Sequence, residues 1–334
     1  MKQALSTGAL GAALATVITL AATTAPAAEV TINLGYAAAE GSAYSVLANK
    51  FEELAEAHSG GTIDVKIRCC AQLATEDEAF KAMQLGTVDM YIITHNNVSP
   101  HFPLMDAFVL PYVFQSKAHA YKVLNGPIGA DFARKLNADT RLHLLTYGFV
   151  GDRDFYNSVR PIKTMADVEG LKIRVPKNQV MIATWEAFGA APIPLPWADT
   201  PTALQTGAVV GADNGTSFIK SQKFYEIASN LAILEHFTYF SPLFASSRIM
   251  DKLDEAQQAA VLKAAEEAGA HHREEMGRQI EEIRGFLAKE GGMARTDPDK
   301  ADFIKAAQKV QDDFAADKGE GFKDLIERIR AAAE

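Results

Sequence analysis

Alternating apolar and polar positions near the start of the chain predict an open α/β unit. Residues 30–36 and 63–67 alternate with period two, as strands do when one face is buried. Apolar residues with helical spacing follow at 46–54 and 76–85, and an apolar run at 90–93 predicts a third, fully buried strand. This order of strand, helix, strand, helix and strand is typical of an open α/β lobe, in which ligands bind beyond the carboxyl ends of the strands.

A second group of elements begins with a short strand at residues 171–175, in which Lys172 and Arg174 share one face. Pro176 ends this strand because proline cannot donate to the sheet. An arginine at the end of a core strand can hold a carboxylate through two parallel charge-assisted hydrogen bonds, which makes Arg174 a candidate for binding an organic anion. The pattern fits equally well an arginine that pairs with a structural Asp or Glu, and both interpretations stay open at this point.

The residues after this strand bring further candidate side chains toward it. Residues 178–189 predict a helix that ends at Gly189. The alternating prolines that follow fix an extended segment, which delivers Trp197 to a defined position before a helix that begins near Thr200. A short strand after that helix leaves Asn214 near its end, beside the strand that carries the arginine.

The N-terminal sequence predicts export. Lys2 is followed by an uncharged stretch that ends in Ala25-Pro26-Ala27, the arrangement of a secretory signal peptide with an A-x-A cleavage site. We predict cleavage after Ala27, with Ala28 as the second choice; the alternative is an uncleaved membrane anchor. The remaining chain exceeds what one core usually supports, which predicts two lobes. The net charge of −9 argues against nucleic acid or an anionic membrane surface as a partner, so an anionic ligand needs local positive groups.

The two cysteines of the chain, Cys69 and Cys70, are adjacent. In an oxidising compartment they could form a vicinal disulfide, but consecutive Cα atoms lie only ~3.8 Å apart, closer than a relaxed disulfide allows. A strained bridge and two free thiols therefore both remain possible from the sequence. We expect no metal site, because neither the cysteines nor the eight histidines have partners at ligand spacing, and we expect the neighbouring His271 and His272 to be solvated helix residues.

Several sequence blocks, in the same order, resemble the substrate-binding subunits of tripartite ATP-independent periplasmic (TRAP) transporters, the C4-dicarboxylate-type family. They are INLGYA, QLATEDEAFKAMQLGTVDM, FVLPYVF, RDFYNSVRPIKTMADVEG, GLKIRVP, AFGAAPIPLPW, TALQTGAVVGADN and KFYE, and they span essentially the whole chain after the signal. The chain departs from the family at Val210, where an Asp is usual, and at Ala212-Asp213-Asn214-Gly215, where a Gln-Glu-Asn-Pro run is usual. Arg174 and Asn214 are retained.

The resemblance implies an α/β, two-lobed periplasmic binding protein fold with a ligand cleft between the lobes and a long bridging helix. The proline-free, Ala-rich run at 254–289 is the candidate for that helix. We expect residues 1–27 to be the signal peptide, 28–150 the first lobe, 151–238 the second lobe, 239–253 a return strand to the first lobe, and 290–334 C-terminal helices that cover the second lobe.

The resemblance also supplies a set of candidate binding residues. Arg174 would hold a carboxylate and Asn214 would orient the ligand. Arg153 stands where the family has a second arginine, although it could instead form a surface salt bridge. Each of the others has a plainer alternative as core or solvated surface: they are Trp197 and Tyr239 as aromatic walls, Glu40 as the acidic residue that ectoine-binding members use for a cationic group, and Asn97 from the HNN sequence.

These features predict an extracytoplasmic, periplasmic solute receptor that binds a small organic acid and passes it to membrane permease subunits of a TRAP transporter. We expect a monomer with no cofactor and no metal. A sensor that presents its ligand to a membrane signalling receptor remains an alternative. We expect no enzymatic activity, because the sequence contains no G-x-S-x-G, Walker or H-E-x-x-H motif; a periplasmic enzyme is the remaining alternative.

Overall fold

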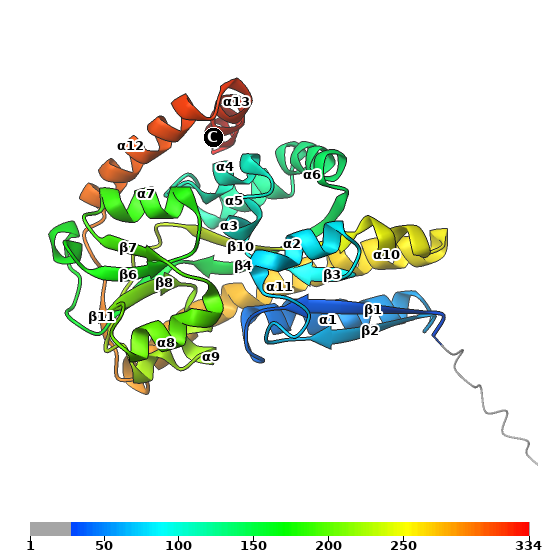
Figure 1. The fold of residues 1–334 in the computed structure, drawn as a ribbon, viewed down its shortest axis with the longest axis horizontal. Coiled ribbons are helices and arrows are strands. Elements are labelled where there is room, and N and C mark those ends of the chain that lie inside the picture. Colours follow the sequence, from blue (N-terminus) through cyan, green and yellow to red (C-terminus); the bar gives the residue numbers. More distant parts are fainter. Residues whose placement is uncertain (1–27, 334) are drawn as a thin grey trace, which may run out of the picture.

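Two sheets define two lobes that lie side by side in the computed structural model, which describes residues 28–333 (Figure 1). The first sheet has the strand order β2-β1-β3-β10-β4, and the second has the order β11-β9-β5-β8-β6-β7. This confirms the predicted α/β, two-lobed fold.

The first sheet is parallel in its N-terminal part and mixed at its other side. β1 pairs in parallel with β2 and β3, whereas β10 runs antiparallel to both β3 and β4. Its strands are β1 (Val30–Tyr36), β2 (Ile63–Arg68), β3 (Met90–Ile92), β4 (Leu142–Asp152) and β10 (Thr238–Ser246), and its helices are α1 (Ala43–His58), α2 (Glu76–Gln84), α3 (His95–Val98), α4 (Asp106–Val109), α5 (Lys117–Leu124), α6 (Pro127–Thr140) and α10 (Ser247–Lys252).

The second sheet is built from shorter strands. β6 pairs in parallel with β7 and β8, and β5 runs antiparallel to β8 and β9. The proline-containing β7 lies at the sheet edge, where the missing backbone donors leave no partner unsatisfied. Its strands are β5 (Asp154–Asn157), β6 (Lys172–Val175), β7 (Ala191–Pro194), β8 (Gly211–Asn214), β9 (Asn230–Ala232) and β11 (Ala294–Thr296), and its helices are α7 (Gln179–Ala187), α8 (Thr200–Gln205) and α9 (Thr216–Ser221).

A single long helix, α11 (Glu255–Lys289), joins the lobes, which confirms the predicted bridging helix. Asp254 caps it by accepting a hydrogen bond from the Gln257 backbone N–H at 2.8 Å, and the Gln257 side chain bonds back to the Asp254 backbone. Its first half packs on α1 and β4, while Ile283 and Leu287 belong to a hydrophobic cluster of the second lobe. The helix thus ties the two cores together along one side of the molecule.

The lobes are also joined by the chain segments next to β4, β5 and β10. β4 continues to Asp152 and β5 begins at Asp154, so that Arg153 is the one residue between strands of different sheets. β10 returns the chain to the first sheet after residues 233–237. Arg153 therefore lies at the hinge between the lobes.

The two C-terminal helices divide between the lobes. α12 (Ala301–Asp317) packs on α7 of the second lobe, whereas α13 (Glu320–Ala331) packs on α4 and α6 of the first. We had expected the whole C-terminal region to cover the second lobe. The difference arises because an amphipathic pattern shows that a helix has an apolar face but not which core that face meets.

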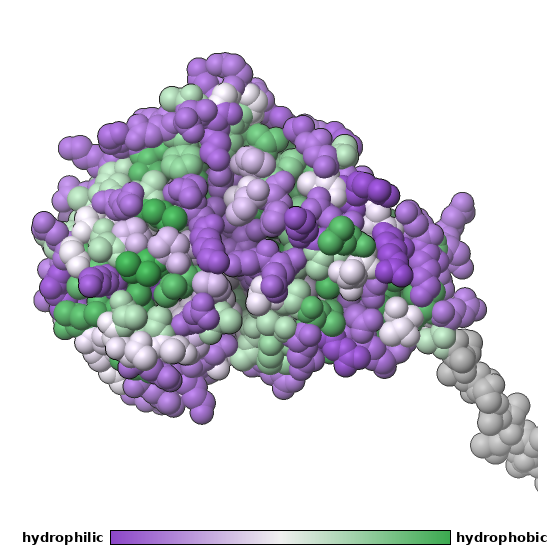
Figure 2. Space-filling model, viewed as in Figure 1, coloured by the Kyte–Doolittle hydropathy of each residue, from purple (hydrophilic) through white to green (hydrophobic). Residues whose placement is uncertain are grey.

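The face of the molecule that Figure 2 shows is mostly hydrophilic, with separate apolar patches. None of the helices in residues 28–333 has the length and apolar character needed to span a membrane. The predicted signal peptide, 1–27, lies outside the described residues.

Candidate ligand-binding site

A small, mostly buried cavity lies between the two lobes. Four of its polar lining side chains, Arg153, Arg174, Asn214 and Tyr239, are no more than 3% exposed. The two lobes thus bury these side chains between them, and we expect a ligand to enter or leave when the lobes move apart. The lining residues are Ala38, Tyr44, Glu76, Thr94, Asn96, Asn97 and Tyr239, from the first lobe and β10, and Arg153, Arg174, Pro176, Trp197, Asn214 and Phe218, from the hinge and the second lobe.

Arg174 is the positive group of the cavity that has no carboxylate partner among residues 28–333. Its Nε donates to the Leu195 carbonyl at 3.0 Å, which leaves the two terminal nitrogens without a protein acceptor in the described chain. Its guanidinium carbon lies 5.6 Å from the centre of the Trp197 ring, within the range of a cation–π contact. Burial, and next the positive charge of Arg153, lower the pKa of Arg174 to about 10, so it remains charged at neutral pH. The geometry leaves its fork available for a bidentate anion.

Arg153, in contrast, is paired within the protein. Its Nε donates to Asp213 Oδ2 at 2.9 Å, and both side chains are almost completely buried. Burial alone would raise the pKa of Asp213, but the Arg153 guanidinium and a hydrogen bond from His236 hold that pKa well below its usual range. Arg153 therefore forms a buried ion pair, rather than the surface salt bridge that we considered from the sequence.

Aromatic side chains from both lobes and one amide from the second lobe complete the cavity. Tyr239 stacks on Phe218 with ring centres 5.6 Å apart, and the Arg153 guanidinium lies 4.8 Å from the centre of the Tyr239 ring. Asn214 ends β8, and its Oδ1 accepts a hydrogen bond from the Gly215 backbone at 2.8 Å. The Asn214 amide nitrogen has no acceptor within residues 28–333, so its N–H groups are available to a ligand in the cavity that Asn214 lines.

A buried acidic residue, Glu76, lies on the first-lobe side. Its Oε1 accepts a hydrogen bond from the Tyr44 hydroxyl at 2.9 Å. Its Oε2 accepts from the Thr94 hydroxyl and from the Asn97 amide, both at 2.6 Å. Burial raises the pKa of Glu76, and these hydrogen bonds oppose the rise. The cavity thus has a positive group on one lobe and a carboxyl group on the other.

The structure brings together six of the seven residues that we predicted for the site: Arg174, Asn214, Arg153, Trp197, Tyr239 and Asn97 all line this cavity. Glu40 does not. It is exposed, its Oε1 lies 3.8 Å from the Cys69 Sγ, and it lines other hollows of the surface. Glu40 thus lies outside this cavity, because the chain after β1 turns its side chain toward Cys69. Cys69 and Cys70 are free thiols.

Sequence reasoning missed two charged residues at the site, Glu76 and Asp213. Glu76 immediately follows Thr75, the cap of α2, where acidic residues are common for reasons of helix stability alone. Asp213 could have been found, because it is a charged residue in a short strand that begins with the small residues Gly211 and Ala212.

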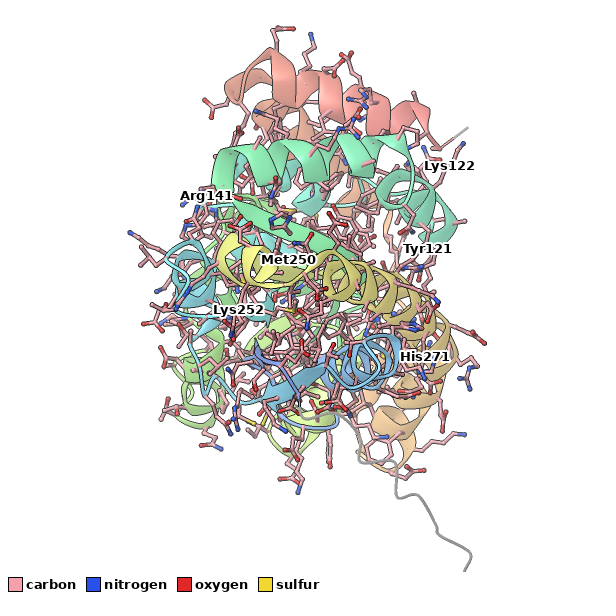
Figure 3. The ribbon with its side chains drawn as sticks, turned by 90° about the vertical axis from the view of Figure 1, so that its right-hand side faces the viewer. Tyr121, Lys122, Arg141, Met250, Lys252 and His271 are labelled. Carbon is pink, nitrogen blue, oxygen red and sulfur yellow. The ribbon has the colours of Figure 1, made fainter. Side chains whose placement is uncertain are left out.

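One expectation about the histidines was also wrong. His271 lies on the outer surface of α11, as Figure 3 shows, but His272 is fully buried. Its ring donates to the Ala43 carbonyl at 2.9 Å and accepts from the Phe149 backbone at 3.1 Å. Burial lowers the pKa of His272 to about 4, so it is a neutral structural residue. No cluster of potential metal ligands occurs among residues 28–333.

Comparison with known proteins agrees with this arrangement. Residues 34–318 match the family described as bacterial extracellular solute-binding protein, family 7. The 2,3-diketo-L-gulonate-binding periplasmic protein YiaO of Escherichia coli is 30% identical over 301 residues, which cover 89% of this chain and 90% of that protein.

Two solved structures of TRAP periplasmic solute-binding proteins are similar along nearly their whole length. One, from Polaromonas with bound D-erythronate, is 30% identical with a TM-score of 0.86 and covers 91% of this chain and 99% of its own. Another, from Roseobacter denitrificans with bound L-galactonate, is 29% identical with a TM-score of 0.84 and the same coverage of 91% and 99%. The chain therefore belongs to family 7 of the bacterial extracellular solute-binding proteins, which includes these periplasmic receptors of TRAP transporters.

Proposed function

We propose that this protein is a periplasmic receptor that captures a small organic acid between its lobes and delivers it to the membrane permease subunits of a TRAP transporter. The observation that carries the proposal is the buried Arg174, whose terminal nitrogens face the cavity without a protein acceptor in the described chain. A buried guanidinium in this state has an unfilled hydrogen-bonding capacity that a ligand carboxylate would satisfy.

The neighbouring groups support a carboxylate at this position. Asn214 would donate its amide to one carboxylate oxygen, and the Trp197 ring would hold the guanidinium in place from the side. Arg153 would add positive potential, although Asp213 already balances its charge. The ligands of the similar proteins, D-erythronate and L-galactonate, are organic acids.

The family supports the proposed periplasmic location of this protein and its proposed permease partners. Related proteins are periplasmic, and we propose that this chain is exported by its N-terminal signal peptide with cleavage after Ala27. We propose that it acts as a monomer, since its cavity is completed by two lobes of one chain. Its role is that of a receptor, not of an enzyme.

A thermal-shift screen over a library of organic acids tests the proposal. A ligand at 100 times its dissociation constant stabilises the folded protein by ~2.7 kcal/mol, which raises the melting temperature measurably. We expect stabilisation by carboxylic acids and none by the matching amides or methyl esters. Stabilisation that is equal for an acid and its ester would contradict a carboxylate-binding site.

Closure of the lobes should be visible in solution. Because the lining side chains are buried between the lobes, we expect the free protein to populate a more open form that admits the ligand, and contacts to both lobes then favour the closed form. Small-angle X-ray scattering is expected to show a smaller radius of gyration when the acid from the screen saturates the protein. An unchanged radius at saturation would show that binding does not close the lobes.

A further inference from the structure

The cavity has one charged lining residue that is paired within the protein and two that are not. Asp213 neutralises Arg153. Of the other lining residues, only Arg174 and Glu76 have an acidic or basic side chain, and neither has an oppositely charged partner within residues 28–333. Arg174 belongs to β6 of the second lobe and Glu76 to α2 of the first. A ligand that bridges the lobes therefore meets a cation at one end and a carboxyl group at the other.

The first-lobe side of the cavity has unused hydrogen-bond acceptors. A carboxylate has about four lone-pair sites, two on each oxygen. Glu76 Oε2 accepts from Thr94 and Asn97, whereas Oε1 accepts only from Tyr44 in the described chain. Asn96, which is 1% exposed and lines the same cavity, has an Oδ1 atom without a hydrogen-bond partner. The Asn96 and Asn97 amide groups each donate one N–H within the protein, Asn96 to Asn97 and Asn97 to Glu76, and each keeps a second N–H. The free acceptors of this wall, on Glu76 and Asn96, can therefore bind donors from the ligand.

We propose that Glu76 is a specificity-determining residue, which selects monocarboxylic acids with hydroxyl groups at the far end and rejects acids with a second carboxylate there. Hydroxyl groups can donate to Glu76 Oε1 and to Asn96 Oδ1. A second carboxylate offers no donor and would lie against a buried acidic group, where like charges repel strongly because little water screens them. The inference rests on the proposed function, since it assumes that the first carboxylate binds Arg174.

Pairs of sugar acids that differ only at the far end give a direct test. D-Galactonate and galactarate share the same hydroxyl groups, and the terminal hydroxymethyl of the first is a carboxylate in the second; D-erythronate and meso-tartrate form the shorter pair. Isothermal titration calorimetry with the wild-type protein is expected to show at least tenfold tighter binding of the monoacid in a pair. Equal binding, tighter binding of the diacid, or no binding of any of the four acids would overturn the inference.

The Glu76→Gln substitution keeps the size of the side chain but removes its charge and one acceptor. We expect it to weaken the monoacid several-fold and to strengthen the diacid or leave it unchanged, so that the preference falls about tenfold. The matched control is Glu40→Gln, which removes an exposed carboxylate of the same lobe outside the cavity and should leave the preference as it is. An unchanged preference in Glu76→Gln would overturn the proposal; if that variant does not fold, the wild-type comparison still decides it.

Two further probes separate this inference from the proposed function. Arg174→Lys should weaken the monoacid and the diacid alike, because both place a carboxylate on this residue. If Arg174→Lys weakens binding but wild type does not prefer the monoacid, only the selectivity inference fails. An acid with a terminal amine, such as 4-aminobutyrate, should bind less tightly than D-erythronate; tighter binding would show that Glu76 serves an ammonium group and would overturn the assignment to hydroxyl groups.

Discussion

Replacing Arg174 with lysine is expected to weaken binding of the organic acid at least tenfold, or by ~1.5–3 kcal/mol. Lysine keeps the positive charge but loses the planar fork, so it cannot form two parallel hydrogen bonds to a carboxylate. It also loses the guanidinium contact with Trp197, whose ring centre lies 5.6 Å from the guanidinium carbon. Calorimetry with the best acid from the screen measures the loss directly.

The same variant should remain folded without ligand. The only hydrogen bond to protein that its side chain forms in residues 28–333 is the one from Nε to the Leu195 carbonyl, and the lysine ammonium can donate to the same acceptor. We therefore expect a small change in the melting temperature of the free protein. Unchanged affinity in Arg174→Lys would remove this residue from the site, whereas lost affinity together with a large loss of stability would indicate a structural role.

Replacing Asp213 with alanine is expected to lower the free energy of unfolding by about 3–5 kcal/mol, because it leaves the buried Arg153 without its counter-charge. The hydrogen bond that His236 forms with this carboxylate at 3.0 Å would be lost as well. Urea titration followed by circular dichroism measures the effect.

The control for this variant is an exposed ion pair. Asp313 pairs with Lys309 on α12, four residues apart and largely exposed, so Asp313→Ala should change stability by less than ~1 kcal/mol. A loss in Asp213→Ala as small as in this control would show that Arg153 finds another partner or water, and that the pair does not stabilise the hinge.

Much of the architecture could be predicted because its signals are local. The period-two strands and the long proline-free run that becomes α11 are legible from residue spacing alone, and Asp254 provides a clear start for that helix. The position of α13 on the first lobe could not be predicted in this way, because its apolar face fits any core that presents a matching surface.

The candidate site was predictable where a backbone feature directs the side chain. Arg174 is placed by the alternation of β6, and Trp197 by the prolines of the edge strand before it. Glu40 and Glu76 show the limit. Both are acidic residues near the start of a helix, and only tertiary packing decides that one is exposed and the other is buried at the cavity.

His272 teaches a related lesson about spacing. It stands in the row Ala264, Ala268, His272, Met276 and Ile280, in which each residue is four after the last, and every member of the row is buried. Considering His272 together with its neighbour His271 concealed this row, since adjacent helix residues point in different directions. The spacing of four was the informative signal.

A crystal structure of the protein with the tightest-binding acid from the screen tests the central claim most directly. The account predicts the ligand in the cavity between the lobes, with one carboxylate bonded to both terminal nitrogens of Arg174 at about 2.7–2.9 Å and within reach of the Asn214 amide. A carboxylate that contacts other groups and leaves the Arg174 fork unoccupied, or a ligand bound outside this cavity, would contradict it.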